Sequence, residues 1–148
     1  MILNILEQII NTKKEEIKTI DIDPSTILAS THSSSLKTAL QKEGLTLIAE
    51  VKQASPSKGM IYNSFDPIKL ATSFEKNGAG AISVLTDEQY FKGSKNDLKS
   101  VREHVQLPIL RKDFIIDPIQ VYETASIGAN AILLILDILS VETSNQII

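Results

Sequence analysis

Two short apolar runs carry, at or just beyond their ends, charged side chains that suit acid–base chemistry. The run at residues 47–51 contains Glu50 and is followed by Lys52, and the run at residues 108–110 leads to Lys112. If the first run is a strand, Glu50 and Lys52 point the same way, because side chains alternate between the two faces of a strand. A carboxylate and an ammonium held together perturb each other's titration, which fits proton transfer. Packing alone explains two charged strand ends in one chain poorly.

The elements that would position these groups are short strands that alternate with helices. Beyond Gly44, apolar runs predict strands at residues 45–51, 81–85, 108–110 and 131–136. Several of these runs are continuous, as expected for strands that are buried on both faces. Asp66-Pro67 predicts a helix start after the first strand, because the carboxylate can cap the helix and proline is tolerated at its first position. The expected fold class is α/β.

A repeat in the second part of the chain favours a barrel. Segments 78–82 and 128–132 share a helix stop, small residues and a strand start, at an interval that fits two βα units of about 25 residues each. Four such units after a helical extension predict half of a (β/α)₈ TIM barrel, which has eight units in roughly 250 residues. A complete doubly wound sheet has the same pattern and stays open as an alternative, although no glycine-rich turn follows the first strand to bind a nucleotide.

The N-terminal part is predicted to be helical. Apolar residues at positions 2, 5, 6, 9 and 10 recur at helical spacing, and Lys-Lys-Glu-Glu at residues 13–16 predicts a solvated helix end. Ser35 is expected to cap a short helix that Gly44 terminates. We expect residues 1–44 to form a helical extension and residues 45–148 to form the first half of the barrel, with the sequence stopping inside the helix after the fourth strand.

Composition narrows the classes of partner. A net charge of -3, a pI near 5.4 and the lack of a basic block argue against nucleic acid. The absence of cysteine excludes disulfides and thiolate metal sites, and His32 and His104 have no partner at metal-ligand spacing, so neither a metal nor a cofactor is expected. No signal peptide or membrane span is predicted at the apolar N-terminus, which lacks a cationic lead. The chain is expected to be a cytoplasmic globular protein.

Four motifs closely resemble those of indole-3-glycerol-phosphate synthase, a (β/α)₈ carboxy-lyase of tryptophan biosynthesis. They are Ile-Ala-Glu-Val-Lys at 48–52 with Ser-Pro-Ser at 55–57, Ser-Val-Leu-Thr-Asp-Glu-Gln-Tyr-Phe at 83–91 with Gly-Ser at 93–94, Leu-Arg-Lys-Asp-Phe-Ile at 110–115, and Gly-Ala-Asn-Ala-Ile-Leu-Leu-Ile at 128–135. Their order and spacing make the signal specific, and the likeness runs from the N-terminal helix to the end of the chain.

The resemblance implies a phosphorylated substrate, 1-(2-carboxyphenylamino)-1-deoxyribulose 5-phosphate, whose ring closure releases CO₂ and water. Lys112 resembles the family's general acid for ring closure, and a lysine in a desolvated pocket can have its pKa lowered toward that task. Lys52 resembles the lysine near the substrate carboxylate and phosphate, which can serve as a second acid. Glu50 resembles the carboxylate that handles the anilino nitrogen and proton removal. The alternatives are a solvated strand-end lysine and an exposed ion pair.

The resemblance also implies four substrate-binding residues: Ser55, Phe91, Phe114 and Leu133. Ser55 lies at the head of the first βα loop, and the three apolar side chains line the anthranilate pocket. The alternatives are a plain turn at Ser55 and core packing for the aromatic rings. Arg111 and Asp113 alternate away from Lys112 and are expected to pair with the helical layer.

Some parts implied by the family are not among these residues. A second catalytic carboxylate, an amide side chain and the phosphate-binding loops come from later strands in the family. We therefore expect the 148-residue chain by itself to be inactive, with open sheet edges that invite a complementary C-terminal half or self-association. A non-catalytic half-barrel remnant or assembly module is the alternative. A sibling barrel such as phosphoribosylanthranilate isomerase is disfavoured by the Glu-Val-Lys and Leu-Arg-Lys-Asp-Phe motifs.

Overall fold

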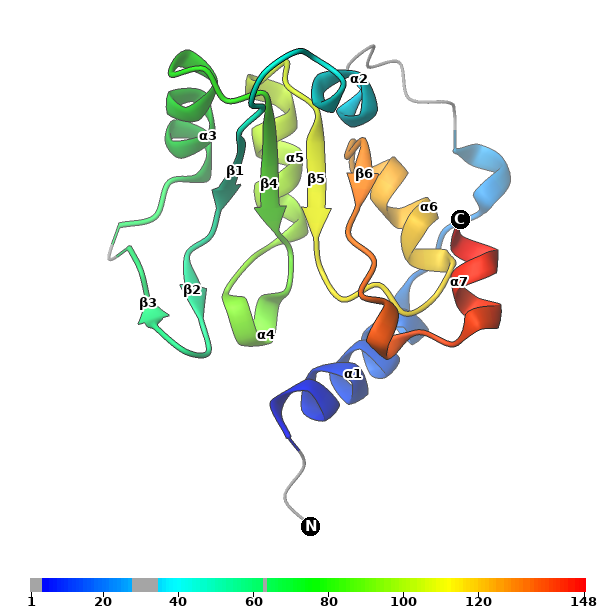
Figure 1. The fold of residues 1–148 in the computed structure, drawn as a ribbon. Helices are drawn as coiled ribbons and strands as arrows, with labels where there is room; N and C mark the ends of the chain where they lie inside the picture. Colours follow the sequence, from blue (N-terminus) through cyan, green and yellow to red (C-terminus); the bar gives the residue numbers. More distant parts are fainter. Residues whose placement is uncertain (1–3, 28–34, 63) are drawn as a thin grey trace.

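A parallel sheet forms the centre of the computed structural model, which describes residues 4–27, 35–62 and 64–148 (Figure 1). Its strands lie in the order β1-β4-β5-β6. Their bounds are Ile48–Val51 (β1), Ala81–Leu85 (β4), Ile109–Lys112 (β5) and Ala131–Ile132 (β6). Every neighbouring pair is parallel, so the carboxyl ends of all four strands lie at one end of the sheet. This end is called the carboxyl edge below, as distinct from the free edges of the outer strands β1 and β6. The α/β class expected from the sequence is confirmed.

Helices connect the strands and cover one face of the sheet. Three helices connect successive strands along the chain: α3 (Pro67–Lys76), α5 (Lys95–His104) and α6 (Ile119–Ser126). Of these, α3 packs against α5. Asp66 caps α3 as expected, because its Oδ1 accepts a hydrogen bond from the Lys69 amide at 2.9 Å. The core lies between these helices and the sheet, and its buried members include Val51, Ile82, Val84, Leu98 and Val101.

No described helix covers the opposite face of the sheet, called the open face below (Figure 1), although Ser83 and Leu85 of the central strand β4 are buried on it. Ile48 and Glu50 are exposed there, and Leu110 and Lys112 are partly buried. Because β1 and β6 are the outer strands, each has an edge without a strand partner among the described residues. One covered face, one open face and two free edges are the geometry of a partial barrel.

Smaller elements follow the strands at the carboxyl edge. The antiparallel hairpin of β2 (Ala54–Ser55) and β3 (Gly59–Met60) comes after β1, and α4 (Glu88–Phe91) comes after β4. A 3₁₀ turn precedes α7 (Val141–Ile147), which follows β6. These elements therefore lie at the carboxyl edge, where Glu50, Lys52 and Lys112 are expected to act.

The N-terminal helices lie at the two ends of the strands. Figure 1 shows α1 (Ile5–Glu16) across the carboxyl edge and α2 (Leu36–Leu40) near the opposite end. Ser35 caps α2 as expected, because its hydroxyl accepts from the Thr38 amide at 3.4 Å. Within the described ranges, no helix combines the length and the apolar character needed to cross a membrane. The division of the chain at residue 44 stays a prediction.

Several expectations about these elements are wrong. The apolar run at 45–51 forms a strand only over Ile48–Val51, and α2 ends at Leu40 rather than at Gly44. The helix end at residues 13–16 is not wholly solvated, because the Lys13 side chain is enclosed by carboxylates from other parts of the chain and is 1% exposed. The apolar run at 131–136 forms a strand only over Ala131–Ile132. The pairing with β5 stops at Ile132, and the chain then leads into a 3₁₀ turn at Leu136–Ile138.

Candidate active site

The carboxyl edge of the open face brings the three charged residues of the sequence prediction into one region. The register pairs Glu50 with Ser83 and Leu85 with Lys112. Lys52 directly follows β1 and is level with Leu85 when this pairing is continued by one residue. Since β4 lies between β1 and β5, the backbones of Lys52 and Lys112 are two strand spacings apart, roughly 10 Å. One small substrate can therefore span both ammonium groups.

Glu50 and Lys52 form an ion pair across one face of β1. The Lys52 Nζ donates a hydrogen bond to the Glu50 Oε1, and their side chains are 35% (Glu50) and 31% (Lys52) exposed. The expectation that both point the same way is confirmed. A pair this accessible contributes little to stability. Lys112 is partly buried and makes no ion pair within the described ranges, so the edge offers one paired and one free ammonium.

Apolar side chains flank the end of β5. The rings of Phe91, at the end of α4, and Phe114, two residues after Lys112, have centroids 6.1 Å apart and planes inclined by 40°. Leu133 comes directly after β6 and is level with Lys112 when the pairing of Leu110 with Ala131 is continued. All three are partly buried. The two rings provide an apolar wall of a kind that suits the flat face of an aromatic ligand.

Ser55 lies in the hairpin that approaches this wall. It belongs to β2, which contacts α4, the helix of Phe91. Its hydroxyl accepts a hydrogen bond from the Lys58 amide at 3.3 Å, as a turn-forming serine does. The turn interpretation of Ser55 therefore describes its contacts here, and a substrate contact would use the same exposed hydroxyl.

Arg111 and Asp113 lie on the other side of β5 from Lys112. The expected pairing with the helical layer is confirmed for Arg111, whereas Asp113 pairs with Arg111, Thr86 and Lys13 of α1. The Arg111 guanidinium donates to Glu123 Oε2 of α6 at 2.8 Å and to Asp113 Oδ2 at 3.0 Å. The Thr86 hydroxyl donates to the same Asp113 oxygen at 2.6 Å. Burial alone would raise the pKa of Asp113 and of Glu123, but the cations beside them, with their hydrogen bonds, outweigh burial and lower both pKa values.

A buried cluster below the carboxyl edge was missed by sequence reasoning. The Lys13 Nζ of α1 lies 2.9 Å from Asp87 Oδ2, 3.0 Å from Asp113 Oδ1 and 2.8 Å from Glu16 Oε2. Burial opposes its charge, but the three carboxylates outweigh burial and raise the pKa of Lys13 above its ordinary value. One signal could have found it: Lys13 stands four residues after the buried Ile9, on the same helix face.

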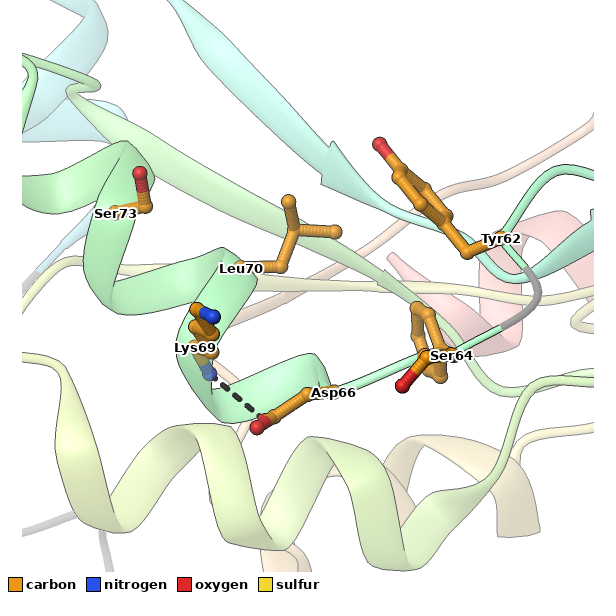
Figure 2. A pocket seen from close by; sticks show the side chains of 7 residues that line it. Tyr62, Ser64, Asp66, Lys69, Leu70 and Ser73 are labelled. Atoms are coloured by element: carbon orange, nitrogen blue, oxygen red, sulfur yellow. Dashed lines mark hydrogen bonds between the residues drawn. The ribbon is translucent and has the colours of Figure 1, made fainter.

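The histidines contribute to no metal site in the described part of the chain. His104 is exposed and its Nδ1 lies 2.7 Å from the Ser100 carbonyl oxygen, and His32 lies outside the described residues. No group of three or more histidines and carboxylates in the described ranges is placed to hold a metal ion. A cavity of about 280 Å³ lies beside the first turn of α3, away from Lys112. Figure 2 shows Leu70 and Tyr62 at this cavity, with the capping bond of Asp66 at its rim.

Comparisons with known proteins agree on one family. The family model for indole-3-glycerol phosphate synthase matches residues 6–148. A protein of that name from Geobacillus sp. (strain WCH70) is 54% identical over 140 residues, which cover 93% of this chain and 54% of the relative. Its namesake in Petrotoga mobilis is 53% identical over 135 residues, covering 91% of this chain and 50% of the relative. The chain thus spans about half the length of these curated relatives, and its four parallel strands are part of the family's TIM barrel. It belongs to the indole-3-glycerol phosphate synthase family.

Proposed function

We propose that this chain supplies the N-terminal half of an indole-3-glycerol-phosphate synthase active site and acts in tryptophan biosynthesis. The observation that carries the proposal is the position of Glu50, Lys52 and Lys112 at one edge and on one face of the parallel sheet. Active sites of (β/α)₈ enzymes lie at this edge. The substrate is 1-(2-carboxyphenylamino)-1-deoxyribulose 5-phosphate, and the reaction takes place in the cytoplasm without a cofactor.

The two lysines act as general acids. Lys112 protonates the ribulose carbonyl while the aromatic carbon attacks it, and CO₂ is lost as the ring regains aromaticity. Lys52 holds the substrate carboxylate until CO₂ has left. A hydroxyl then leaves as water, which needs a second proton donor, and Lys52 provides that proton. The free ammonium of Lys112 supports its role, because no described carboxylate competes with the substrate for it.

Glu50 and the apolar side chains orient the substrate. Glu50 lies at the anilino nitrogen and accepts the proton that the neighbouring CH₂ carbon loses as the hydroxyl leaves, and the ion pair with Lys52 holds the Glu50 carboxylate at the mouth of the site. Phe91, Phe114 and Leu133 hold the anthranilate ring, which the geometry of the two phenylalanine rings suits. Ser55 donates its hydroxyl to the substrate from the first βα loop.

The activity requires strands that are not among these 148 residues. The open face and the two free edges leave the site without a phosphate grip and without exclusion of water. We infer that a C-terminal half carrying strands five to eight completes the barrel, either in the same polypeptide or as a partner. A non-catalytic half-barrel that associates through the free edges is the second candidate, favoured by the same edges.

A fluorescence assay for indole-3-glycerol phosphate separates the candidates. The 148-residue chain is expected to give no signal, and the chain joined to or mixed with a C-terminal half is expected to turn over. Lys112→Ala in the completed enzyme should lower kcat by about 10²–10⁴-fold, the usual worth of a general acid. Lys99→Ala, on the exposed side of α5, is the matched control. Near-normal turnover by Lys112→Ala would defeat the assignment, and rapid turnover by the isolated chain would refute the need for a second half.

A further inference from the structure

The ammonium of Lys13 reaches two loops that leave the carboxyl edge. Its Nζ lies 2.9 Å from Asp87 Oδ2 and 3.0 Å from Asp113 Oδ1. Asp87 follows β4 and Asp113 follows β5, so one side chain of α1 contacts the exits of two adjacent strands. Lys13 is 1%, Asp87 0% and Asp113 4% exposed. These three side chains are therefore buried, and the surrounding packing restricts their geometry.

The Asp87 carboxylate connects Lys13 to the backbone of Phe91. While its Oδ2 lies at Lys13, its Oδ1 accepts hydrogen bonds from the Tyr90 amide at 2.8 Å and from the Phe91 amide at 3.1 Å. These bonds cap α4 and fix the backbone from which the Phe91 ring extends. A second contact from α1, between the Thr12 and Tyr90 hydroxyls at 3.0 Å, holds the same short helix.

The Asp113 carboxylate likewise connects Lys13 to the backbone of Phe114, next to Lys112. Its Oδ1 accepts a hydrogen bond from the Phe114 amide at 2.8 Å and also faces the Lys13 Nζ. Asp113 is covalently adjacent to Lys112, so the conformation of one backbone constrains the other. The aromatic pair and the proposed acid thus depend on the two carboxylates that Lys13 holds together.

We infer that Lys13 is a positioning residue for the ring-closing reaction. By joining Asp87 to Asp113 it sets the separation of the Phe91 and Phe114 rings and the direction in which Lys112 leaves β5. Its enclosed ammonium does not touch the substrate. This inference rests on the proposed function, and it adds to that function a requirement for α1, which lies outside the barrel strands. A displacement of about 1 Å in such a site can cost on the order of 100-fold in rate.

Steady-state kinetics of the completed enzyme test the inference first. Lys13→Met keeps the length of the side chain and removes its charge, and we expect kcat/KM to fall by about 10–100-fold. Lys13→Arg restores a cation and should regain part of that loss. Lys18→Met is the matched control, because Lys18 pairs with Glu15 on the surface and its side chain is 65% exposed. Values for Lys13→Met within about twofold of those for Lys18→Met would overturn the inference.

Fluorine NMR separates positioning from a general loss of structure. The chain has four phenylalanines, so a chain labelled with 4-fluorophenylalanine and paired with an unlabelled C-terminal half gives four resonances. In Lys13→Met we expect the signals of Phe91 and Phe114 to shift while those of Phe65 and Phe74, on the α3 side, stay in place. Four signals that all move, or none that moves, would contradict a positioning role. This readout needs no turnover, so an inactive unmodified enzyme would refute the proposed function while the spectra still decide the role of Lys13.

Discussion

Replacing Lys13 by methionine should destabilise this protein far more than replacing a surface lysine. The substitution leaves the Asp87 carboxylate, which is 0% exposed, without its ion-pair partner. Asp113 keeps Arg111, whose guanidinium lies 3.0 Å from its Oδ2. The loss therefore falls mainly on one buried charge rather than on the whole cluster.

The magnitude follows from the burial of these groups. Breaking a buried ion pair by removing one partner costs about 3–5 kcal/mol, because the other charge stays out of water. The exposed pair of Lys18 with Glu15 is worth about 0–1 kcal/mol. A domain is stable by about 5–15 kcal/mol, so Lys13→Met removes a large fraction of the total. Adding Asp87→Asn to Lys13→Met should return part of the loss, since the neutral amide no longer needs a cation.

Urea unfolding followed by far-ultraviolet circular dichroism measures this difference. With a slope of about 2 kcal/mol per molar urea, Lys13→Met should lower the midpoint by about 1.5–2.5 M and Lys18→Met by less than about 0.5 M. Equal midpoints for the two variants would refute the reasoning. So would a double variant that is less stable than Lys13→Met, because the buried carboxylate could then not be the source of the loss.

Two further predictions concern acid and one glycine. The pKa of Asp113 is lower in the folded than in the unfolded protein. The stabilisation from this carboxylate is therefore present above the unfolded pKa of about 4 and is lost as pH falls through the folded pKa. Thermal melts from about pH 6 to about pH 2 should fall steeply at the acid end, and Asp113→Asn should flatten that fall. In Gly93→Ala the new Cβ would overlap the Leu85 carbonyl oxygen and lie 2.6 Å from its carbon. Urea unfolding should give a loss of about 3 kcal/mol, against about 1 kcal/mol for Gly44→Ala, which has φ +87° and open space. Equal losses would contradict the clash.

Local signals account for the parts of the fold that the sequence predicts well. Asp66 before Pro67 fixes the start of α3, and Ser35 fixes the start of α2, because each cap contacts an amide only three residues away. The alternation of side chains along β1 and β5 places Glu50 with Lys52, and Arg111 away from Lys112. Such relations need no knowledge of how distant segments meet.

The burial of Lys13 could not be predicted from neighbouring residues, because it depends on segments that are distant in the sequence. Its partners Asp87 and Asp113 come from loops far along the chain, and a Lys-Lys-Glu-Glu run is usually solvated. The helix face shared with Ile9 was the available signal, and it indicates burial without naming a partner. The length of β6 also depends on the tertiary context, because a run of apolar residues does not show where the ladder with β5 ends, which is at Ile132.

Cross-linking tests the central claim, that Lys52 and Lys112 lie at one mouth. The chain has no cysteine, so Lys52→Cys combined with Lys112→Cys introduces the two reactive thiols of the sequence. A bismaleimide that spans about 10 Å, two strand spacings, should join this pair. The control pair combines Lys112→Cys with Lys42→Cys, because Lys42 lies near Gly80 and Pro108 at the opposite ends of the strands. Efficient cross-linking at 52 and 112 with little in the control is the predicted result. Cross-linking of the control pair without the other would contradict the shared mouth and with it the biosynthetic assignment.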